Sequence, residues 1–339
     1  MSTTEPNGPT RKPRGLILMD AETHAAVLPE SERRRLSALA DVDTALAIDD
    51  FDDPRAAEPL RRAEFLITGW GTPVVTPEVL ARAPKLAFIA HAAGSLKHHL
   101  GPHVWDAGVT VSTAADVLAG FVAEYTLSMI HLTMKGVLRQ ARRYRLDGWP
   151  TAAGRLGPAR PTIGVVGASR IGRIVLSGLA GSVPTVLYDP YCSPDTADAL
   201  GTRLVDLDEL CASVDVLSVH APQLPETRHL IDGRLLGLLR DGATVINTAR
   251  GSIIDTDALV AECASGRLDA ILDVTDPEPL PAGHPLFGLS NVIVTPHVAG
   301  AQGYEMAALG AYAVTEVARF FAGSRPLGLI SADELPTQA

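Results

Sequence analysis

Short apolar segments rich in β-branched residues alternate with longer helical patterns along most of this chain. The alternation favours a parallel sheet covered by helices, because neighbouring parallel strands need a crossover connection that a helix supplies. The second half of the chain contains six such segments, which we predict as strands: Thr162–Val166, Thr185–Tyr188, Val214–His220, Ala243–Asn247, Ala270–Asp273 and Val292–Val294. Six strands with crossover helices are typical of a doubly wound, dinucleotide-binding sheet.

The first part of the chain shows the same alternation, so we expect a second α/β domain. Its predicted strands are Gly15–Asp20, Phe65–Trp70, Leu86–Ala90 and Val109–Ser112. A long apolar helix is predicted over Val117–Gln140, followed by a connecting loop rich in Gly and Pro over Leu146–Arg160. A last helix, Gln302–Ala322, has no strong strand after it and is expected to leave the second sheet.

The charge balance limits the partners that this chain can bind. Lys and Arg number 29 against 39 Asp and Glu, which gives a net charge of −10. Such a balance argues against a nucleic-acid or membrane partner, because both are anionic surfaces. We find no apolar run of membrane-spanning length, and residues 1–14 are polar and Pro-rich, as in a flexible tail rather than a signal peptide.

The cysteines indicate a reducing compartment. Cys192, Cys211 and Cys263 are odd in number and have no CxxC spacing, so neither a full set of disulfides nor a thiolate metal site is expected. His98, His99 and His103 lie close together, but no carboxylate follows until Asp106, so we predict no metal. A cytoplasmic protein is the expectation.

A candidate cofactor loop follows the strand Thr162–Val166. It reads Gly167-Ala168-Ser169-Arg170-Ile171-Gly172 and runs into a helix, which is GxGxxG with serine at the second glycine. Gly167 would make the tight turn and Gly172 would let helix and strand approach closely, while the amides of the helix N-terminus bind a pyrophosphate. Ser169 narrows the space for the phosphate, but its hydroxyl can donate a hydrogen bond in return.

An acidic residue at the end of the next strand indicates which dinucleotide is bound. Asp189 lies 17 residues after Gly172 (189 − 172), where a carboxylate accepts hydrogen bonds from the adenosine ribose. No Lys or Arg follows until Arg203, so nothing nearby would pair with a 2′-phosphate. We therefore predict NAD over NADP; the alternative is that Asp189 is only a turn residue before Pro190.

Three polar residues each follow a predicted strand: Arg250, Glu278 and His297. In an open α/β sheet, the carboxyl ends of the strands line the binding crevice. Arg250 would hold a substrate carboxylate and polarise a carbonyl, and His297 would exchange a proton with that carbonyl oxygen. Glu278 would bond the other imidazole nitrogen and fix its tautomer. Taken singly, each has a structural explanation as a surface arginine, an exposed carboxylate or a core histidine.

Together these stretches resemble the NAD-dependent D-isomer-specific 2-hydroxyacid dehydrogenases. The similar stretches are GVVGASRIGR, YDPY, VDVLSVHAPQLPET, GATVINTARGSIIDTDAL, LDVTDPEPLP and NVIVTPHVAG. The resemblance covers roughly residues 65–322 and is strongest from 162 to 300. A formate-dehydrogenase-like member would have Gln rather than Glu beside the histidine, so Glu278 argues against that subgroup.

The resemblance implies the site and the domain layout. It implies Arg250, Glu278 and His297 as the catalytic residues, and Ala93, Gly94 and Ser95 as the loop that holds the substrate carboxylate. It implies cofactor contacts from His220, Ala221, Pro222, Thr248, Ala249 and Asp273. It also implies an NAD-binding Rossmann domain over residues 117–302, inserted into a flavodoxin-like substrate domain over 15–116 and 303–339, and a homodimer.

Two questions stay open at this stage. Relatives of this family include NAD(H)-sensing corepressors that can keep the three residues, so a binding protein on the same fold is the alternative to an enzyme. The substrate side chain is also open. His91, Lys97, His98 and His99 make the predicted substrate loop basic, which would suit a phosphorylated or otherwise anionic substrate; a solvated charged loop is the other interpretation.

Overall fold

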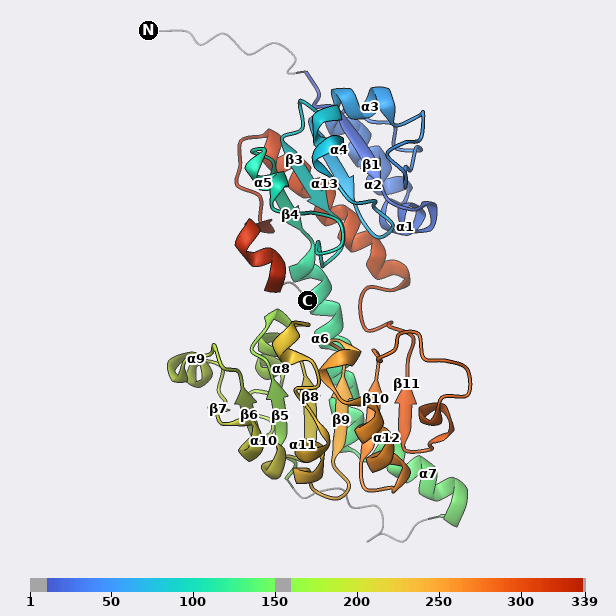
Figure 1. The fold of residues 1–339 in the computed structure, drawn as a ribbon, viewed down its shortest axis with the longest axis vertical. Coiled ribbons are helices and arrows are strands. Elements are labelled where there is room, and N and C mark those ends of the chain that lie inside the picture. Colours follow the sequence, from blue (N-terminus) through green and yellow to red (C-terminus); the bar gives the residue numbers. More distant parts are fainter. Residues whose placement is uncertain (1–10, 150–159, 338–339) are drawn as a thin grey trace. The chain divides into compact units, whose positions relative to one another are not determined.

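The computed structural model describes residues 11–149 and 160–337 of the chain (Figure 1). The chain divides into two compact units, one formed by Met1–Leu118 and Gly303–Gln338 and the other by Ala119–Gln302. The N-terminal and C-terminal segments therefore belong to the same unit. Both units are built on largely parallel sheets, which confirms the predicted α/β fold class.

The sheet of the first unit has the order β1-β2-β3-β4-β12. Strands β1 (Gly15–Leu18), β2 (Phe65–Thr68), β3 (Phe88–His91) and β4 (Thr110–Thr113) are parallel, and β12 (Leu329–Ile330) runs antiparallel to β4. Beside β1, only isolated parallel bridges form, at Asp41 and Ile48. This segment occupies the place of the flanking strand in the expected flavodoxin-like order.

Two helical layers cover this sheet, and the alternation of side chains along the strands explains why. Leu16, Leu66, Ile89 and Val111 are paired in register and belong to a core with helices α3 (Ala57–Arg62), α4 (Pro77–Arg82) and α5 (His103–Asp106). The residues directly before Leu66 in β2 and Ile89 in β3 point to the other face. There Phe65 and Phe88 pack against Phe321 and Phe320 of α13 (Met306–Phe321), which lies with α1 (Ala21–Val27) and α2 (Glu30–Leu39).

The second unit has a seven-stranded parallel sheet in the order β11-β10-β9-β8-β5-β6-β7. The strands are β5 (Ile163–Val166), β6 (Thr185–Tyr188), β7 (Arg203–Leu204), β8 (Val216–Val219), β9 (Thr244–Asn247), β10 (Asp269–Leu272) and β11 (Val292–Val294). The strand order reverses between β5 and β8, where the chain turns from building one side of the sheet to the other. Ligands of doubly wound sheets bind at the carboxyl ends of strands at such a switch point.

Helices again lie in two layers on this sheet (Figure 1). Ala123 and Ile130 of α6 (Ala115–Met134) share a core with α8 (Arg170–Leu179) and the inward residues of one sheet face. The other face packs α10 (Leu207–Ser213), α11 (Gly233–Leu238) and α12 (Thr256–Ala264). The short helix α9 (Pro194–Ala199) follows β6, and α7 (Val137–Asp147) follows α6.

The predicted continuous helix Val117–Gln140 was wrong, because the structure breaks it into α6 and α7. The break lies at Gly136, which has a φ of 63°, a left-handed conformation that glycine adopts without strain. Helix α7 then runs to Asp147, into the predicted loop Leu146–Arg160, of which residues 150–159 lie outside the described residues.

Two further expectations were incomplete. The predicted flexible tail 1–14 includes four described residues, of which Pro13 accepts the Asp41 amide at 2.9 Å and Arg14 donates its amide to Glu64 at 3.0 Å. The described part of that tail is therefore bound to the first unit. Strands β7 and β12 were not predicted, since each has two residues and leaves no periodic pattern.

Helix α6 also changes an expectation about membranes. It is 20 residues long and its most apolar window has a mean hydropathy of 1.3, so by length and composition it could cross a bilayer. The sequence analysis found no such stretch. One such helix is weak evidence for a membrane span, because core helices can meet the same criterion; in α6, 28% of that window is buried, including Ala123 and Ile130.

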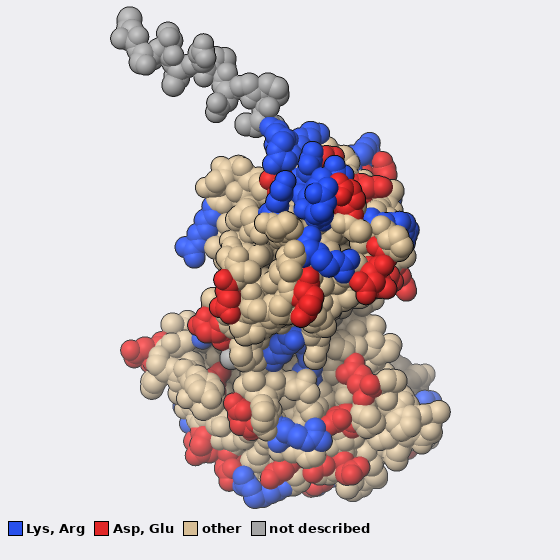
Figure 2. Space-filling view, turned by 45° about the horizontal axis from the view of Figure 1, so that its top comes forward, with Lys and Arg blue, Asp and Glu red and all other residues tan. Residues whose placement is uncertain are grey.

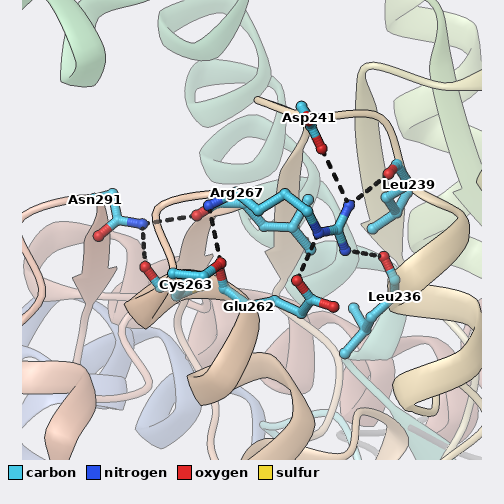
Figure 3. Close-up of polar contacts among 9 residues, drawn as sticks. Leu236, Leu239, Asp241, Glu262, Cys263, Arg267 and Asn291 are labelled. Atoms are coloured by element: carbon cyan, nitrogen blue, oxygen red, sulfur yellow. Dashed lines mark hydrogen bonds and ion pairs between the residues drawn. The ribbon is translucent and has the colours of Figure 1, made fainter.

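At the amino-terminal edge of the second sheet, the side chain of Arg267 joins the end of α11 to α12 (Figure 3). The Arg267 guanidinium donates to the carbonyls of Leu236 and Leu239 at the end of α11 and to the Glu262 carboxylate of α12, 2.6 Å from its Nε. Beside it, the Asn291 amide donates to the carbonyls of Cys263 and Leu268. These bonds satisfy helix-end carbonyls at the edge opposite the carboxyl ends of the strands.

Candidate active site

The loop after β5 is shaped by two glycines. Gly167 has a φ of 100°, and a Cβ there would lie 2.8 Å from the amide nitrogen of Ala221, in the loop after β8. A Cβ on Gly172 would lie 2.1 Å from the carbonyl oxygen of Gly167. Neither position can accept a side chain. The absence of a side chain at Gly167 lets the loops after β5 and β8 touch at the switch point, and its absence at Gly172 lets the start of α8 contact the end of β5. This is the cradle that a dinucleotide pyrophosphate requires.

Ser169, which replaces the second glycine of the motif, is the N-cap of α8. Its Oγ accepts the amide of Gly172 at 3.3 Å. The hydroxyl hydrogen is not used in this bond and remains able to donate to a phosphate oxygen. Arg170, which is exposed, and Ile171, which is half-buried, form the first turn of the helix after it.

Asp189 ties the end of β6 to this loop. One carboxylate oxygen accepts the Ala168 amide at 2.7 Å and the other accepts the Tyr191 amide at 2.8 Å. Each oxygen has a further lone pair that can accept a ribose hydroxyl. Asp189 therefore lies beside the glycine turn and also holds the turn that contains Pro190.

The loop after β8 carries a histidine that is fully buried. Burial lowers the pKa of His220 to about 3, and its Nε2 is hydrogen-bonded to Ser218 Oγ at 2.8 Å. His220 is therefore a neutral group beneath the glycine loop. Ala221 is buried and Pro222 is half-buried after it.

The structure brings His297 and Glu278 together. His297 Nδ1 and Glu278 Oε1 are 2.6 Å apart. Since Nδ1 faces the carboxylate, Nε2 is the nitrogen that can exchange a proton with a substrate. His297 has a φ of 54°, an uncommon conformation for a residue with a side chain, so the surrounding loop must hold it there.

The buried carboxylate of Asp273 holds that loop. Its Oδ1 accepts the Thr295 hydroxyl at 2.6 Å and the Val298 amide at 2.8 Å, and its Oδ2 accepts the Ala299 amide at 2.9 Å. Its backbone carbonyl accepts the amide of His297 at 2.9 Å. Asp273, at the end of β10, thus binds both sides of the catalytic histidine candidate.

Arg250 follows β9 and is held by its neighbours. The Asn247 side chain donates to the Arg250 carbonyl at 2.9 Å and accepts the Ala249 amide at 3.0 Å. Burial lowers the pKa of Arg250, and the charge of Glu278 opposes that shift. The guanidinium is thus a partly desolvated cation near the Glu278 carboxylate, and such a group binds an anionic substrate strongly.

The loop that carries Glu278 is anchored by close backbone contacts. A Cβ on Gly251 would lie 1.9 Å from the carbonyl carbon of Thr275, so the loops after β9 and β10 touch at a glycine. Thr256 donates its hydroxyl to the Asp276 carbonyl at 2.9 Å, and Arg228 pairs with the Asp276 carboxylate at 3.1 Å. Glu278 is therefore placed by backbone packing although it is itself exposed.

Thr248 lies on the α6 side of β9. Its hydroxyl is 2.8 Å from that of Thr126, which in turn donates to the Val122 carbonyl. Thr248 and Ala249 are buried at the carboxyl end of the strand, where the resemblance expects the nicotinamide.

The predicted substrate loop follows β3 in the first unit. The Thr113 hydroxyl approaches the carbonyls of Ala93 and Gly94, at 2.8 and 2.7 Å, and so holds the loop from β4. Within the described residues, the structure records no hydrogen bond from the amides of Ala93, Gly94 or Ser95. An ordered loop with three amides of this kind suits a carboxylate.

Comparison with known proteins matches residues 127–299 to the family model of the D-isomer specific 2-hydroxyacid dehydrogenase NAD binding domain. The chain belongs to this family. The predicted resemblance and the prediction of NAD as the cofactor are therefore confirmed, and the glycine cradle described above fits that cofactor.

Individual relatives agree with this assignment. The chain is 34% identical over 266 residues to D-3-phosphoglycerate dehydrogenase from Mycobacterium leprae, covering 78% of this chain and 50% of the relative. It is 30% identical to glyoxylate reductase from Thermofilum pendens, covering 78% of this chain and 80% of the relative. The chain thus spans about half the length of the phosphoglycerate dehydrogenases that it matches.

A solved structure of the family has the same fold. D-lactate dehydrogenase from Aquifex aeolicus, complexed with NAD and lactic acid, is 26% identical with a TM-score of 0.68. The match covers 91% of this chain and 96% of that chain. The relatives carry different substrates in their names, so the family alone does not select one.

The structure bears on the interpretation of the substrate loop as basic, one of the two left open by the sequence. His91 is fully buried, and desolvation with a smaller effect of His99 lowers its pKa to about 3. Burial also lowers the pKa of His99, although a hydrogen bond of its Nδ1 to the Thr72 carbonyl, 2.6 Å long, opposes the shift. Two of the four residues that made the loop look basic are therefore neutral near pH 7.

The sequence analysis missed several residues that build the site. The Thr295 hydroxyl accepts a hydrogen bond from Tyr125 of α6 at 2.9 Å and donates one to the Asp273 carboxylate. Asn247 and Gly251 shape the Arg250 turn. A polar residue that ends an apolar strand, such as Asn247, was a usable signal; the Tyr125 contact joins residues 170 apart in sequence and left none.

Proposed function

We propose that this protein transfers a hydride between NAD(H) and the C2 atom of a D-2-hydroxyacid/2-keto acid pair. The observation that carries the proposal is the 2.6 Å contact between His297 and Glu278, beside Arg250 at the carboxyl ends of β9, β10 and β11. A proton donor, its carboxylate partner and a desolvated cation are the three groups that carbonyl reduction of a keto acid needs. Family membership supports the same reaction class.

The cofactor supplies or accepts the hydride when it is bound. Gly167, Ser169 and Gly172 with the first turn of α8, Arg170 and Ile171, would hold its pyrophosphate. Asp189 would accept the ribose hydroxyls, and the loop His220–Pro222 would line the groove. Thr248, Ala249 and Asp273 lie at the strand ends nearest to His297 and would flank the reactive end.

The chain's own groups would carry the proton chemistry. Arg250 would bind the substrate carboxylate and polarise the carbonyl. In the first unit, the backbone amides of Ala93, Gly94 and Ser95 would also bind a carboxylate, as the resemblance implies. His297 Nε2 gives a proton to the carbonyl oxygen during reduction and removes it during oxidation. Glu278 stabilises the imidazolium through Nδ1 and holds the ring in one orientation.

We assign the two roles to the two units. Residues 117–302 would form the NAD-binding domain, and 15–116 with 303–339 the substrate domain. Charge and cysteine content support a cytoplasmic enzyme acting on a small molecule, with neither a nucleic acid nor a membrane as partner.

A homodimer is part of the proposal. Leu132 of α6 and Val137 and Tyr144 of α7 are 41%, 40% and 56% exposed, and no side chain of α7, which the structure describes in full, is buried. We infer that a second copy of the chain covers these side chains, since exposed apolar patches mark interaction sites. Light scattering after size exclusion tests this, and a monomer would contradict it.

The enzymatic assay is NADH consumption with a panel of 2-keto acids, with NADPH in parallel. Turnover with NADH is expected; a preference for NADPH would contradict the role of Asp189. His297→Ala should reduce kcat by ~10²–10⁴-fold, as loss of general acid catalysis does, and leave the Kd for NADH within ~3-fold. Glu278→Gln should act in the same direction while keeping the shape of the contact.

The wild-type result separates the enzyme from the sensor. A protein that binds NADH but turns over none of the acids would favour the NAD(H)-sensing alternative. In that case His297→Ala would change neither NADH binding nor any rate.

A further inference from the structure

The loops after β2 and β3 of the first unit are joined into one binding edge. The turn after β2 is closed by the Gly69 amide, which donates to Thr72 Oγ1 at 2.9 Å. His99, from the loop after β3, donates from Nδ1 to the Thr72 carbonyl, and its own carbonyl accepts the Val75 amide at 2.9 Å. The turn that carries Trp70 is therefore fixed next to the loop that contains Ala93–Ser95.

Positive charge is scarce at this edge. His91 and His99 are neutral near pH 7 because both are desolvated. Residues 69–76 include no Lys or Arg, and the basic side chains of the loop after β3 other than His99 are Lys97 and the exposed His98, which follow Ala93–Ser95. A phosphate is normally bound by an arginine fork or by several converging donors, and this edge presents no guanidinium from either loop.

A carboxylate lies beside the same turn. A Cβ on Gly71 would lie 2.5 Å from Oδ2 of Asp20, which follows β1. Asp20 is held in place because it caps α1, accepting the amide of Thr23 at 2.7 Å and its hydroxyl at 2.8 Å. An anionic substrate group next to Trp70 would thus meet a fixed negative charge.

Six basic residues of this unit lie at the opposite edge of the sheet. Arg11, Lys12 and Arg14 directly precede β1, Arg61 and Arg62 precede β2, and Lys85 precedes β3. Figure 2 shows Lys and Arg side chains gathered at one end of this unit. The carboxyl edge is therefore the less cationic of the two.

The carboxyl edge of the first unit's sheet exposes apolar side chains. Trp70 is 37% exposed and Val74 is 53% exposed, both on the turn that Thr72 and His99 fix. A tryptophan side chain on a rigid turn offers a large apolar contact at little entropic cost. A ligand whose apolar group covers such a side chain removes its apolar surface from water, which favours binding.

We propose that Trp70 is a specificity-determining contact for the substrate side chain, and that this side chain is uncharged and apolar, either aliphatic or aromatic. The inference rests on the proposed function, because Ala93–Ser95 would bind the substrate carboxylate and the turn that carries Trp70 is hydrogen-bonded, through Thr72 and Val75, to His99 of the same loop. An apolar substrate side chain differs from the phosphorylated one that the name of the D-3-phosphoglycerate dehydrogenase relatives indicates for those proteins.

The test compares kcat/KM for phenylpyruvate, 4-methyl-2-oxopentanoate, glyoxylate and 3-phosphohydroxypyruvate. The two apolar acids are expected to exceed the phosphorylated acid by ~100-fold or more. Trp70→Ala should lower kcat/KM for the apolar acids by ~10–100-fold, the range that a lost apolar contact produces, and change that for glyoxylate by less than ~3-fold. Leu39→Ala is the matched control, since Leu39 is an exposed apolar residue at the end of α2.

Two outcomes would overturn the inference. One is that 3-phosphohydroxypyruvate is the best substrate. The other is that Trp70→Ala lowers the rate with glyoxylate as much as with phenylpyruvate, which would mean a general structural effect.

A binding readout separates this inference from the proposed function. Phenyllactate should quench tryptophan fluorescence of the holoenzyme, and Trp70→Phe should remove most of that quenching. If no acid is turned over, the proposed function fails, and the titration still decides the side-chain class. Tighter binding of 3-phosphoglycerate than of phenyllactate would then refute it.

Discussion

Replacing Asp273 with Asn tests whether this carboxylate holds the His297 loop. Asn has nearly the same shape but a single acceptor oxygen, whereas three donors converge on the carboxylate at 2.6–2.9 Å. If the amide oxygen keeps Thr295 and Val298, its NH2 group faces the Ala299 amide, and two donors oppose each other. A lost hydrogen bond to a charged group is worth ~1.5–3 kcal/mol, and the other two bonds weaken because the acceptor becomes neutral.

We therefore expect Asp273→Asn to lower the free energy of unfolding of the second unit by ~3 kcal/mol. For a domain of this size that corresponds to a loss of ~6–12 °C in Tm, measured by calorimetry. The kcat should fall by ~10²-fold, because a displaced His297 no longer meets the reacting oxygen. The Kd for NADH should change much less, since the glycine loop lies on other strands.

Asp269→Asn is the matched control in the same strand. Asp269 accepts one bond from the partly exposed Arg139 at 3.0 Å, a pair worth ~0–1 kcal/mol. Equal Tm and kcat for the two variants would refute the reasoning. A weakened Kd for NADH with unchanged Tm would instead mean that Asp273 acts by contacting the cofactor.

Three further predictions concern the remaining structure. Gly251→Ala places a Cβ 1.9 Å from the Thr275 carbonyl carbon, so it should displace the loop of Glu278 and lower kcat by at least ~10-fold; unchanged kinetics would contradict that packing. Arg267→Met removes the guanidinium hydrogen bonds to Leu236, Leu239 and Glu262 in Figure 3 and should lower Tm by several degrees while kcat/KM of the folded enzyme stays the same; an equal loss of activity would show that the two edges are coupled. The pKa values of His91 and His220 fall from 6.5 to about 3 on folding, so below pH 6.5 the unfolded chain binds protons that the folded one does not. The free energy of unfolding should then decrease by ~1.4 kcal/mol per pH unit for each histidine as the pH falls from 6.5 toward 3, and His91→Asn should flatten that slope in urea titrations at pH 5–6.5; a slope equal to that of the wild type would show that His91 is not the group involved.

Local patterns in the sequence were sufficient for the fold class, the family and NAD as the cofactor. The alternation of strands and helices is encoded by residue spacing, and the motif Gly167–Gly172 lies within one strand-turn-helix unit. The order of Arg250, Glu278 and His297 after successive strands was also visible, because strand ends in a parallel sheet share one edge.

Other features needed long-range contacts. The neutral state of His91 and His99 depends on desolvation, which a sequence does not display, and so the loop that looked basic is largely uncharged. The break at Gly136 and the two-residue strands β7 and β12 leave too short a pattern to detect.

The difference between the two kinds of information is physical. Hydrophobic periodicity, glycine turns and the order of polar residues act over a few neighbours, so the sequence by itself determined a doubly wound dinucleotide-binding chain and its candidate residues. The tertiary structure alone decided which of those residues are fixed by hydrogen bonds and which are charged. Asp273 binds amides about 25 residues further along the chain, and Thr295 meets Tyr125 across 170 residues. Burial and hydrogen bonding of that kind arise only when distant segments pack together.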